Sequence, residues 1–466
     1  MKKEFYLGID IGTSSVKGVL RTVDGETFSF KHSYSGQCPD NWIQAIKMLV
    51  SDCNEICGGN ITAVGFSSQV GTYVVKGRDV IPWYSGTGRE ELDFLLSVIP
   101  QEDFIKCISM YHPNLVSYPL PRLMFIQKNY GEGCDVCMPK DYIINDLTGE
   151  NVTDVFSMRG IANLDNCKYA DSLISRLGIK QNLPHIGYPT DLVGYVTEKA
   201  SLKYGLNPDT RVYLGCNDFF AGLLGMGIYN PGDTFELSGT SEHFGYIGNE
   251  INRDAFVSGK FFNCNCSYGG TKSSGSACDF AIKNFGIEGI DFEKTVLNDA
   301  PIFLPYLNGE RAPVFDDNAR GVFFGIGSGT DRNALAYSVL EGVVFSIFDI
   351  AQSMKIPAPE RIICSGGSSN DPLMNKIRAS LFDCDIIGVC DNNTSALGAC
   401  MLAMTGDGLY ADLSSAVSDC VRYGIVTKPL PEYREILLKR YLVYKELYGN
   451  LKPAFLKLKC IKELKI

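Results

Sequence analysis

The chain contains the same glycine-rich turn twice, once near its start and once in its middle. The first copy reads GTSSVKG at residues 12–18, and the second reads GTSEHFG at residues 239–245. Each copy follows an extended apolar stretch and leads into a second strand-like segment. Glycine permits close backbone approach, and successive N–H groups in such a turn can bind an anion. The repeat therefore predicts two similar domains that face each other across a ligand carrying phosphate.

The size and composition of the chain are those of a globular protein with more than one domain. It has 466 residues, of which 45% are hydrophobic and 21% charged, enough for two or three domains. The formal net charge of −10 argues against nonspecific nucleic-acid binding. An anionic nucleotide stays open as a ligand, because backbone amides and a metal ion can hold phosphate. We find no signal-peptide pattern and no run of about 18 apolar residues, which predicts a cytoplasmic protein with no membrane partner.

Seventeen cysteines are scattered along the chain, many of them in apolar surroundings. In a cytoplasmic protein such thiols are mostly small buried hydrophobic groups. Cys134 and Cys137 form a single CxxC pair, which gives little support to zinc or redox chemistry without a second pair at suitable spacing.

Strand and helix patterns alternate along the chain, which predicts an α/β fold. Residues 4–23 read as a β-hairpin closed by the first glycine turn. The NPGD turn at residues 230–233 directly precedes the second hairpin, so we predict an N-terminal domain over 1–228 and a C-terminal domain over 229–466. Further strands are expected over 61–66, 211–214 and 361–364, and helices over 42–56, 331–354 and 394–404 and from 371 onward.

Two carboxylates lie at strands with apolar sequences, close to predicted turns. Asp10 immediately precedes the first glycine turn, and a buried carboxylate needs a partner. Beside phosphate that partner is hydrated Mg²⁺, and the alternative is an aspartate that caps its own turn. Asp218 ends another apolar strand, at the edge where open α/β sheets bind ligands. It can accept a proton from an attacking hydroxyl or cap the following helix, and the two roles are compatible.

The order of short motifs resembles that of one family, the FGGY carbohydrate kinases of the sugar kinase, actin and heat-shock chaperone superfamily. Residues 8–17 and 237–241 resemble its two phosphate motifs, and residues 215–222 resemble the segment with the catalytic aspartate. The resemblance extends along essentially the whole chain, and many strings in the family's order are far more specific than one. Further matches are LPYLNGERAP at 304–313, RGVFFG at 320–325, VLEG at 339–342, SGGSSN at 365–370 and ALGA at 396–399.

The resemblance implies two actin-like (ribonuclease H-like) domains, with mixed sheets flanked by helices, that close on ATP, Mg²⁺ and a sugar in the cleft between them. The N-terminal domain would carry the sugar and the base Asp218, and the C-terminal domain the nucleotide. Asp10 would organise Mg²⁺ through water. Phosphoryl transfer needs mainly positioning and charge stabilisation, which suits this arrangement. The residues implied in nucleotide binding are Gly12, Thr13, Ser14, Gly239, Thr240, Gly366, Gly367 and Asn370.

Residues that would face the sugar match the family less closely. Residues 67–71 resemble the GQMHG region of ketose kinases but lack its Met-His pair, and residues 81–89 resemble a Trp-Asn-Asp-Gly-Arg motif with two extra residues and no aspartate. Trp83 can belong to the core or stack on a sugar. These departures put the identity of the sugar in question. The implied substrate-binding residues are Gln69, Val70, Trp83, Arg89, Asn217 and Asp218.

The expected function is ATP-dependent phosphorylation of a free ketose, a pentulose or hexulose of the xylulokinase-like branch. A polyol or a sugar acid, of the glycerol or gluconate type, is the alternative within the family. A catalytically silent sugar-binding regulator is the alternative from another class, and the retained Asp10, Thr13 and Asp218 argue against it. A chaperone-like ATPase is disfavoured because its peptide-binding domain has no counterpart here. The expected partners are a sugar and ATP, and a homodimer is left open.

Overall fold

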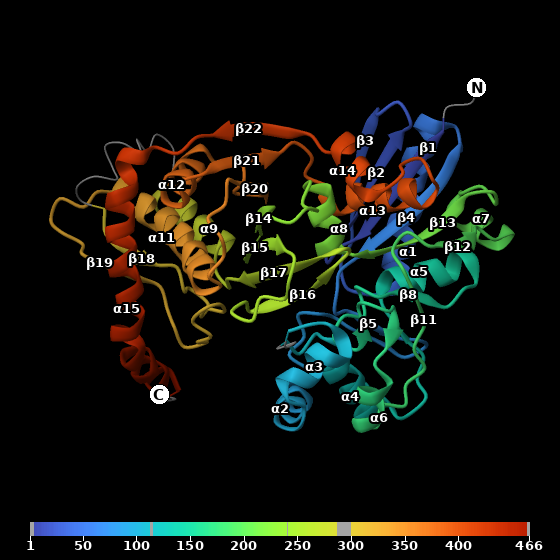
Figure 1. Ribbon diagram of the computed structural model, residues 1–466, viewed down its shortest axis with the longest axis horizontal. Helices are drawn as coiled ribbons and strands as arrows, with labels where there is room; N and C mark the ends of the chain where they lie inside the picture. The colour runs from blue at the N-terminus through green and yellow to red at the C-terminus, as the bar shows by residue number, and fades with distance from the viewer. Residues whose placement is uncertain (1–3, 112–114, 240, 287–299, 464–466) are drawn as a thin grey trace. The chain divides into compact units, whose positions relative to one another are not determined.

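The computed structural model of the protein describes residues 4–111, 115–239, 241–286 and 300–463 (Figure 1). The chain forms two compact units. Unit 1 comprises Met1–Tyr229, Gly259–Cys264 and Asn393–Val421, and unit 2 comprises Asn230–Ser258, Asn265–Asn392 and Arg422–Ile466. A division near residue 229 is therefore present. Residues 259–264 and 393–421, which the sequence analysis assigned to the C-terminal domain, instead belong to unit 1.

Unit 1 is built on a six-stranded mixed sheet with the order β12-β13-β4-β1-β2-β3. Within this sheet, β1 pairs antiparallel with β2 and parallel with β4, and β4 pairs parallel with β13. The edge strands β3 and β12 are antiparallel to their neighbours. The strands are β1 (Phe5–Ile11), β2 (Ser15–Thr22), β3 (Thr27–Ser33), β4 (Ile61–Ser68), β12 (Leu192–Tyr195) and β13 (Arg211–Asn217).

Unit 2 repeats this arrangement in a sheet with the order β16-β17-β15-β14-β20-β21-β22. Its central β14 pairs antiparallel with β15 and parallel with β20, and β20 pairs parallel with β21. In each unit, a glycine turn joins the central strand to its antiparallel partner, which confirms the predicted structural repeat. The strands are β14 (Thr234–Ser238), β15 (Glu242–Gly248), β16 (Val257–Phe261), β17 (Cys264–Gly270), β20 (Arg361–Gly366), β21 (Asp385–Val389) and β22 (Tyr423–Thr427).

Two helices cover opposite faces of the sheet of unit 1. Gly18 of β2 faces α1 (Pro39–Cys57), whereas Gly8 of β1 faces α13 (Thr394–Gly406). Gly8 is opposite Val19, the neighbour of Gly18 in β2. Successive residues of a strand point to opposite faces, so Gly8 and Gly18 lie on different faces of the sheet. A Cβ atom at Gly8 would lie 1.9 Å from the Ala396 carbonyl oxygen. This close approach explains why α13 belongs to unit 1, and Figure 1 shows the orange-red helix against the blue strands.

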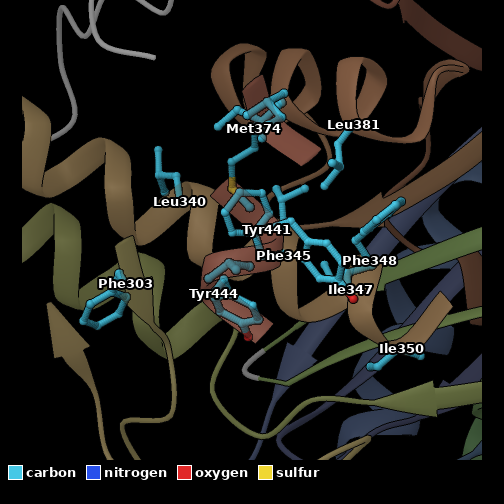
Figure 2. Packing of buried hydrophobic residues seen from close by; sticks show 14 of the residues in the cluster. Phe303, Leu340, Phe345, Ile347, Phe348, Ile350, Met374, Leu381, Tyr441 and Tyr444 are labelled. Carbon is cyan, nitrogen blue, oxygen red and sulfur yellow. The ribbon is translucent and has the colours of Figure 1, made fainter. Parts of the chain in front are cut away.

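The core of unit 2 surrounds α11 (Arg332–Ser353), which is buried along nearly its whole length. Figure 2 shows Phe345 and Phe348 of this helix close to Tyr441 and Tyr444 of α15 (Pro431–Glu463). Among the described helices, α11 alone is long and apolar enough to cross a membrane, and 94% of its apolar window is buried inside the structure. Burial of this kind is what the core helix of a folded domain requires.

The remaining elements are shorter. In unit 1 they are α2 (Arg89–Val98), α3 (Gln101–Ile108), α4 (Pro119–Tyr130), α5 (Pro139–Thr148), α6 (Asp171–Arg176), α7 (Glu198–Tyr204), α8 (Asp218–Gly225), α14 (Leu413–Cys420), β5 (Tyr73–Val75), β6 (Asp79–Ile81), β7 (Val136–Cys137), β8 (Val152–Asp154), β9 (Ala162–Asn163), β10 (Lys168–Tyr169) and β11 (His185–Gly187). In unit 2 they are α9 (Gly275–Phe285), α12 (Pro372–Phe382), β18 (Ile302–Leu304) and β19 (Val322–Phe324).

Candidate functional site

Three neighbouring parallel strands of unit 1 end at the same edge of the sheet. Asp10 on β1 is in register with Ser67 on β4, and Asn217 at the end of β13 is in register with Ser68. Asp218 follows as the first residue of α8. Both carboxylates singled out in the sequence therefore lie at the carboxyl edge of the sheet, where open α/β sheets bind ligands.

The first glycine turn is held through its carbonyl oxygens. The Tyr34 hydroxyl donates to the Gly12 carbonyl oxygen, and the Gln37 amide donates to that of Thr13. The Tyr34 N–H donates to the Ser14 carbonyl oxygen at 3.0 Å. Thr13 and Ser14 are themselves exposed. A turn fixed in this way can present its N–H groups to an anion, as the sequence motif predicts.

Asp10 is buried beside this turn. One oxygen, Oδ1, accepts a hydrogen bond of 2.9 Å from the Ser67 hydroxyl. The other, Oδ2, lies 3.8 Å from the position that a Cβ atom would occupy at Gly12. Burial raises the pKa of Asp10, although Ser67 and the positive charge of Lys17 oppose this effect. A carboxylate that is costly to ionise and faces a phosphate-type turn fits a hydrated magnesium ion, which prefers oxygen ligands.

Asp218 is partly buried and its carboxylate is held by backbone groups. Its Oδ1 atom accepts N–H donors from Val70 at 3.3 Å and Phe219 at 2.9 Å. Burial and then the negative charge of Asp10 raise the pKa of Asp218 to about 7, while these two backbone donors oppose the rise. A carboxylate whose pKa lies near neutrality is suited to accept a proton as a general base.

The residue before it, Asn217, has a structural role. Its Oδ1 atom accepts the Phe220 N–H at 2.9 Å and makes it the N-cap of α8, so the alternative that Asp218 is the cap is wrong. Its Nδ2 atom donates to the Phe156 carbonyl oxygen at 3.1 Å. Asn217 is fully buried, so its side chain is engaged in the fold and is not presented to a ligand.

Of the predicted sugar-facing residues, Gln69 is buried inside the fold, whereas Trp83 and Arg89 are exposed. Gln69 is buried and donates to the Gly12 carbonyl oxygen at 3.1 Å, so it supports the turn. Trp83 is 38% exposed, and its indole N–H donates to the Thr13 hydroxyl at 3.0 Å. The alternative that Trp83 belongs to the core is therefore wrong. Arg89 is exposed at the start of α2, and no hydrogen bond recorded for the described residues connects it to Asp218.

Unit 2 contains a cavity of about 310 Å³ next to the second glycine turn. Ser238 of β14 is in register with Gly366 of β20, so the cavity also lies at the carboxyl edge of its sheet. Gly366 has φ +99°, and a Cβ atom there would lie 1.9 Å from the Ser238 carbonyl oxygen. Asn370 is exposed and does not line the cavity, and Thr240 lies outside the described residues. The lining residues are Ser238, Gly239, Gly275, Cys278, Asp279, Ile282, Leu340, Gly367, Ser368, Asp371 and Met374.

Several residues that shape these two sites were missed by the sequence analysis. Ser67 carries a detectable signal, because it is the first residue of the GQMHG-like segment 67–71 and parallel pairing brings it beside Asp10. Tyr34 and Gln37 follow β3 and carry no motif. Arg378 of α12 lies far along the chain from Glu242, and only the folded structure shows that the two are paired.

Comparison with known proteins relates both halves of the chain to one family. Residues 5–225 match the N-terminal domain, and residues 238–406 the C-terminal domain, of the FGGY family of carbohydrate kinases. A xylulose kinase from Lactococcus lactis subsp. lactis (strain IL1403) is 27% identical, with 96% of this chain and 97% of the relative covered. A gluconokinase from Bacillus subtilis (strain 168) is 23% identical, with 93% and 94% covered.

A solved structure confirms the fold class. The crystal structure of a ligand-bound xylulose kinase from Lactobacillus acidophilus matches with a TM-score of 0.87 at 23% identity. The match covers 98% of this chain and all of that chain (100%). The two-domain α/β architecture expected from the sequence is therefore present.

Proposed function

Because the chain belongs to the FGGY family of carbohydrate kinases, it is a sugar kinase with ATP as co-substrate, and we propose that its acceptor is a free ketose. Xylulose is the first candidate, since the similarity to a xylulose kinase extends over 96% of the chain. The observation that carries the proposal is the position of Asp218 at the carboxyl edge of the sheet, beside Asp10 and with its pKa raised to about 7.

In the proposed reaction Asp218 acts as the general base. The sugar hydroxyl gives its proton to the Asp218 carboxylate while its oxygen forms a bond to the γ-phosphorus of ATP, and the bond from that phosphorus to ADP breaks. The Val70 and Phe219 N–H groups hold one carboxylate oxygen and so fix the direction of the other. The N–H groups of the exposed turn at Thr13 and Ser14 would bind the oxygens of the phosphoryl group while it passes from ADP to the sugar.

The nucleotide is proposed to bind in the cavity of unit 2. Glycines at positions 239 and 367 allow the backbone to approach phosphate and ribose closely. Ile282, Leu340 and Met374 give the cavity an apolar wall against which a base can pack. Asp10 would hold Mg²⁺ through water, and bound Mg²⁺ would neutralise charge on the phosphates.

Replacement of Asp10 by asparagine should raise the Mg²⁺ concentration needed for half-maximal activity by about 10-fold, because the amide removes the negative charge. The measurement is a titration of kcat against Mg²⁺ at saturating ATP and sugar. Asp24→Asn, an exposed turn residue, is the matched control and should titrate like the wild type. A Mg²⁺ dependence of Asp10→Asn equal to that of the control would remove Asp10 from the metal site.

A substrate panel tests the proposed acceptor. ADP release is measured with xylulose, other pentuloses and hexuloses, glycerol and gluconate, each against a blank without sugar. We expect kcat/KM for one ketose to exceed that for glycerol and gluconate by at least about 100-fold, because buried polar groups that lose their partner hydroxyl are costly. Selective turnover of gluconate, the substrate in the name of the Bacillus subtilis relative, would refute the ketose assignment and favour a sugar acid. Sugar binding without ADP release would favour the silent regulator.

A further inference from the structure

A charged cluster is buried next to the cavity of unit 2. Arg378 of α12 pairs with Glu236 of β14 and, at 3.1 Å, with Glu242 of β15, and all three side chains are fully buried. Burial raises the pKa of Glu236 well above its usual value. Despite burial, Arg378 holds the pKa of Glu242 below its usual value. The Arg378 guanidinium is thus the cation that faces both buried glutamates.

A chain of hydrogen bonds runs from this cluster to the lining of the cavity. Arg378 donates to the Ser368 hydroxyl oxygen at 2.7 Å, and the Ser238 hydroxyl donates to Glu242 at 2.6 Å. The two hydroxyl oxygens lie 2.6 Å apart. Either hydroxyl can be the donor between them, because the Ser368 hydroxyl also donates to Glu242 at 3.3 Å. Ser238 is the last residue of β14 and Ser368 lies in the turn after β20, and both line the cavity beside a glycine segment.

The same cluster holds the backbone of the cavity walls. Arg378 also donates to the Ser368 carbonyl oxygen at 3.1 Å, and Asn375 donates to that of Ser369 at 2.8 Å. Ser274, the residue before α9, donates its hydroxyl to the second oxygen of Glu242. Three wall segments, at residues 238–239, 274–275 and 368–369, thus meet at one arginine–glutamate pair.

The helix that carries Arg378 has a rigid base. Met374, Ile377 and Leu381 of α12 are buried in the hydrophobic core of unit 2, and Figure 2 shows Met374 and Leu381 beside residues of α11. Arg378 itself is fully buried and does not line the cavity. It makes no direct contact with the cavity, and it is hydrogen-bonded to segments that do.

We infer that Arg378 is a positioning residue for the nucleotide. It holds the glycine turn at residue 239 and the loop at residues 366–369 at the spacing that the nucleotide requires, and this inference rests on the proposed function of the cavity. The guanidinium is needed because it donates in several fixed directions at once, to Glu242 and to both oxygens of Ser368. A lysine would keep the charge but lacks the planar arrangement of donors.

The test is Arg378→Lys, with Arg440→Lys as the matched control. Arg440 also pairs with a buried glutamate of unit 2, Glu341 at 2.6 Å, but neither residue lines the cavity or contacts its glycine segments. The dissociation constant of ADP is measured by titration calorimetry in the absence of sugar, and KM for ATP, KM for the sugar and kcat are measured in the coupled assay. We expect Arg378→Lys to raise the ADP dissociation constant and KM for ATP about 10-fold, the effect of losing one hydrogen bond to a charged group.

KM for the sugar and kcat should change by less than about 2-fold, a separation that a general loss of folding would not produce. The control should leave all four quantities unchanged. If Arg378→Lys does not fold, the double variant Arg378→Met with Glu242→Gln removes the charge pair together and should show the same selective loss of ADP binding. Wild-type affinity for ADP in whichever variant folds would overturn the inference about Arg378 and would leave the proposed function of the cavity unchanged. Failure of the wild type to bind ADP would instead overturn the proposed function of the cavity.

Discussion

Replacement of Asp218 by asparagine should lower kcat about 10²–10⁴-fold, the usual effect of losing a positioned base. Asparagine has nearly the same size, and its Oδ1 atom can still accept the Val70 and Phe219 N–H groups. The ADP dissociation constant should therefore equal that of the wild type. The measurement is single-turnover phosphorylation combined with ADP titration. A kcat within 3-fold of the wild type, on the order of what a surface change produces, would exclude Asp218 as the base.

The same carboxylate sets an expected pH dependence. The pKa of Asp218 is raised to about 7, so the base form is lost as the pH falls through 7, and kcat should decrease with it.

The effect of Asp218 on the stability of the fold changes with pH in the opposite direction. A raised pKa in the folded state means that stability present at low pH is lost as the pH rises through about 7. Asp218→Asn should therefore be more stable than the wild type above pH 7, by roughly 1–3 kcal/mol. Thermal melts at pH 6 and pH 8 check this difference, and an equal effect at both would contradict it.

Replacement of Lys140 by methionine should destabilise unit 1 by roughly 3–5 kcal/mol, the effect of breaking a buried ion pair from one side. The Lys140 ammonium lies 2.6 Å from Asp141 and 2.9 Å from Asp154, and none of the three side chains is more than 2% exposed. Burial opposes the charge of Lys140, yet the two aspartates raise its pKa above the usual value. Methionine would leave two carboxyl groups buried without their cation.

Tryptophan fluorescence isolates this effect in urea unfolding, because the chain has 2 tryptophans and both, Trp42 and Trp83, belong to unit 1. Lys203→Met is the control, since Lys203 pairs with Asp146 where both side chains are partly exposed. That substitution should change the free energy of unfolding by less than about 1 kcal/mol. An equal loss in the two variants would show that the buried cluster around Lys140 has no special contribution.

Local sequence patterns were sufficient to predict the strands and turns near the candidate site. The hairpins at the two glycine turns follow from alternating apolar residues and turn chemistry, both of which are local. The positions of Asp10 and Asp218 at the ends of apolar strands follow from the strand and turn patterns around them. These predictions depend on neighbours along the chain, which is why they hold.

Other features depend on contacts between distant segments and could not be read in this way. Asn217 and Asp218 are both good cap residues, and only the backbone direction at the strand end decides that Asn217 is the cap. The small residues around Gly398 predict a close helix contact but not the partner, which is Ala221 of α8. Arg378 sits in an ordinary helical pattern, and its role arises from two strands more than 100 residues earlier in the chain, as the separation from Glu242 of 136 residues shows.

The assignment of α13 to unit 1 has a consequence for synthesis of the protein. The chain leaves the ribosome from its N-terminus, so β1 emerges early, whereas α13 ends at Gly406. One face of the sheet in unit 1 must therefore wait, without its covering helix, until most of unit 2 has been translated. Nascent chains with apolar strands uncovered for that long are prone to aggregate and depend on chaperones. Unit 1 can therefore complete its fold only after most of unit 2 has been translated.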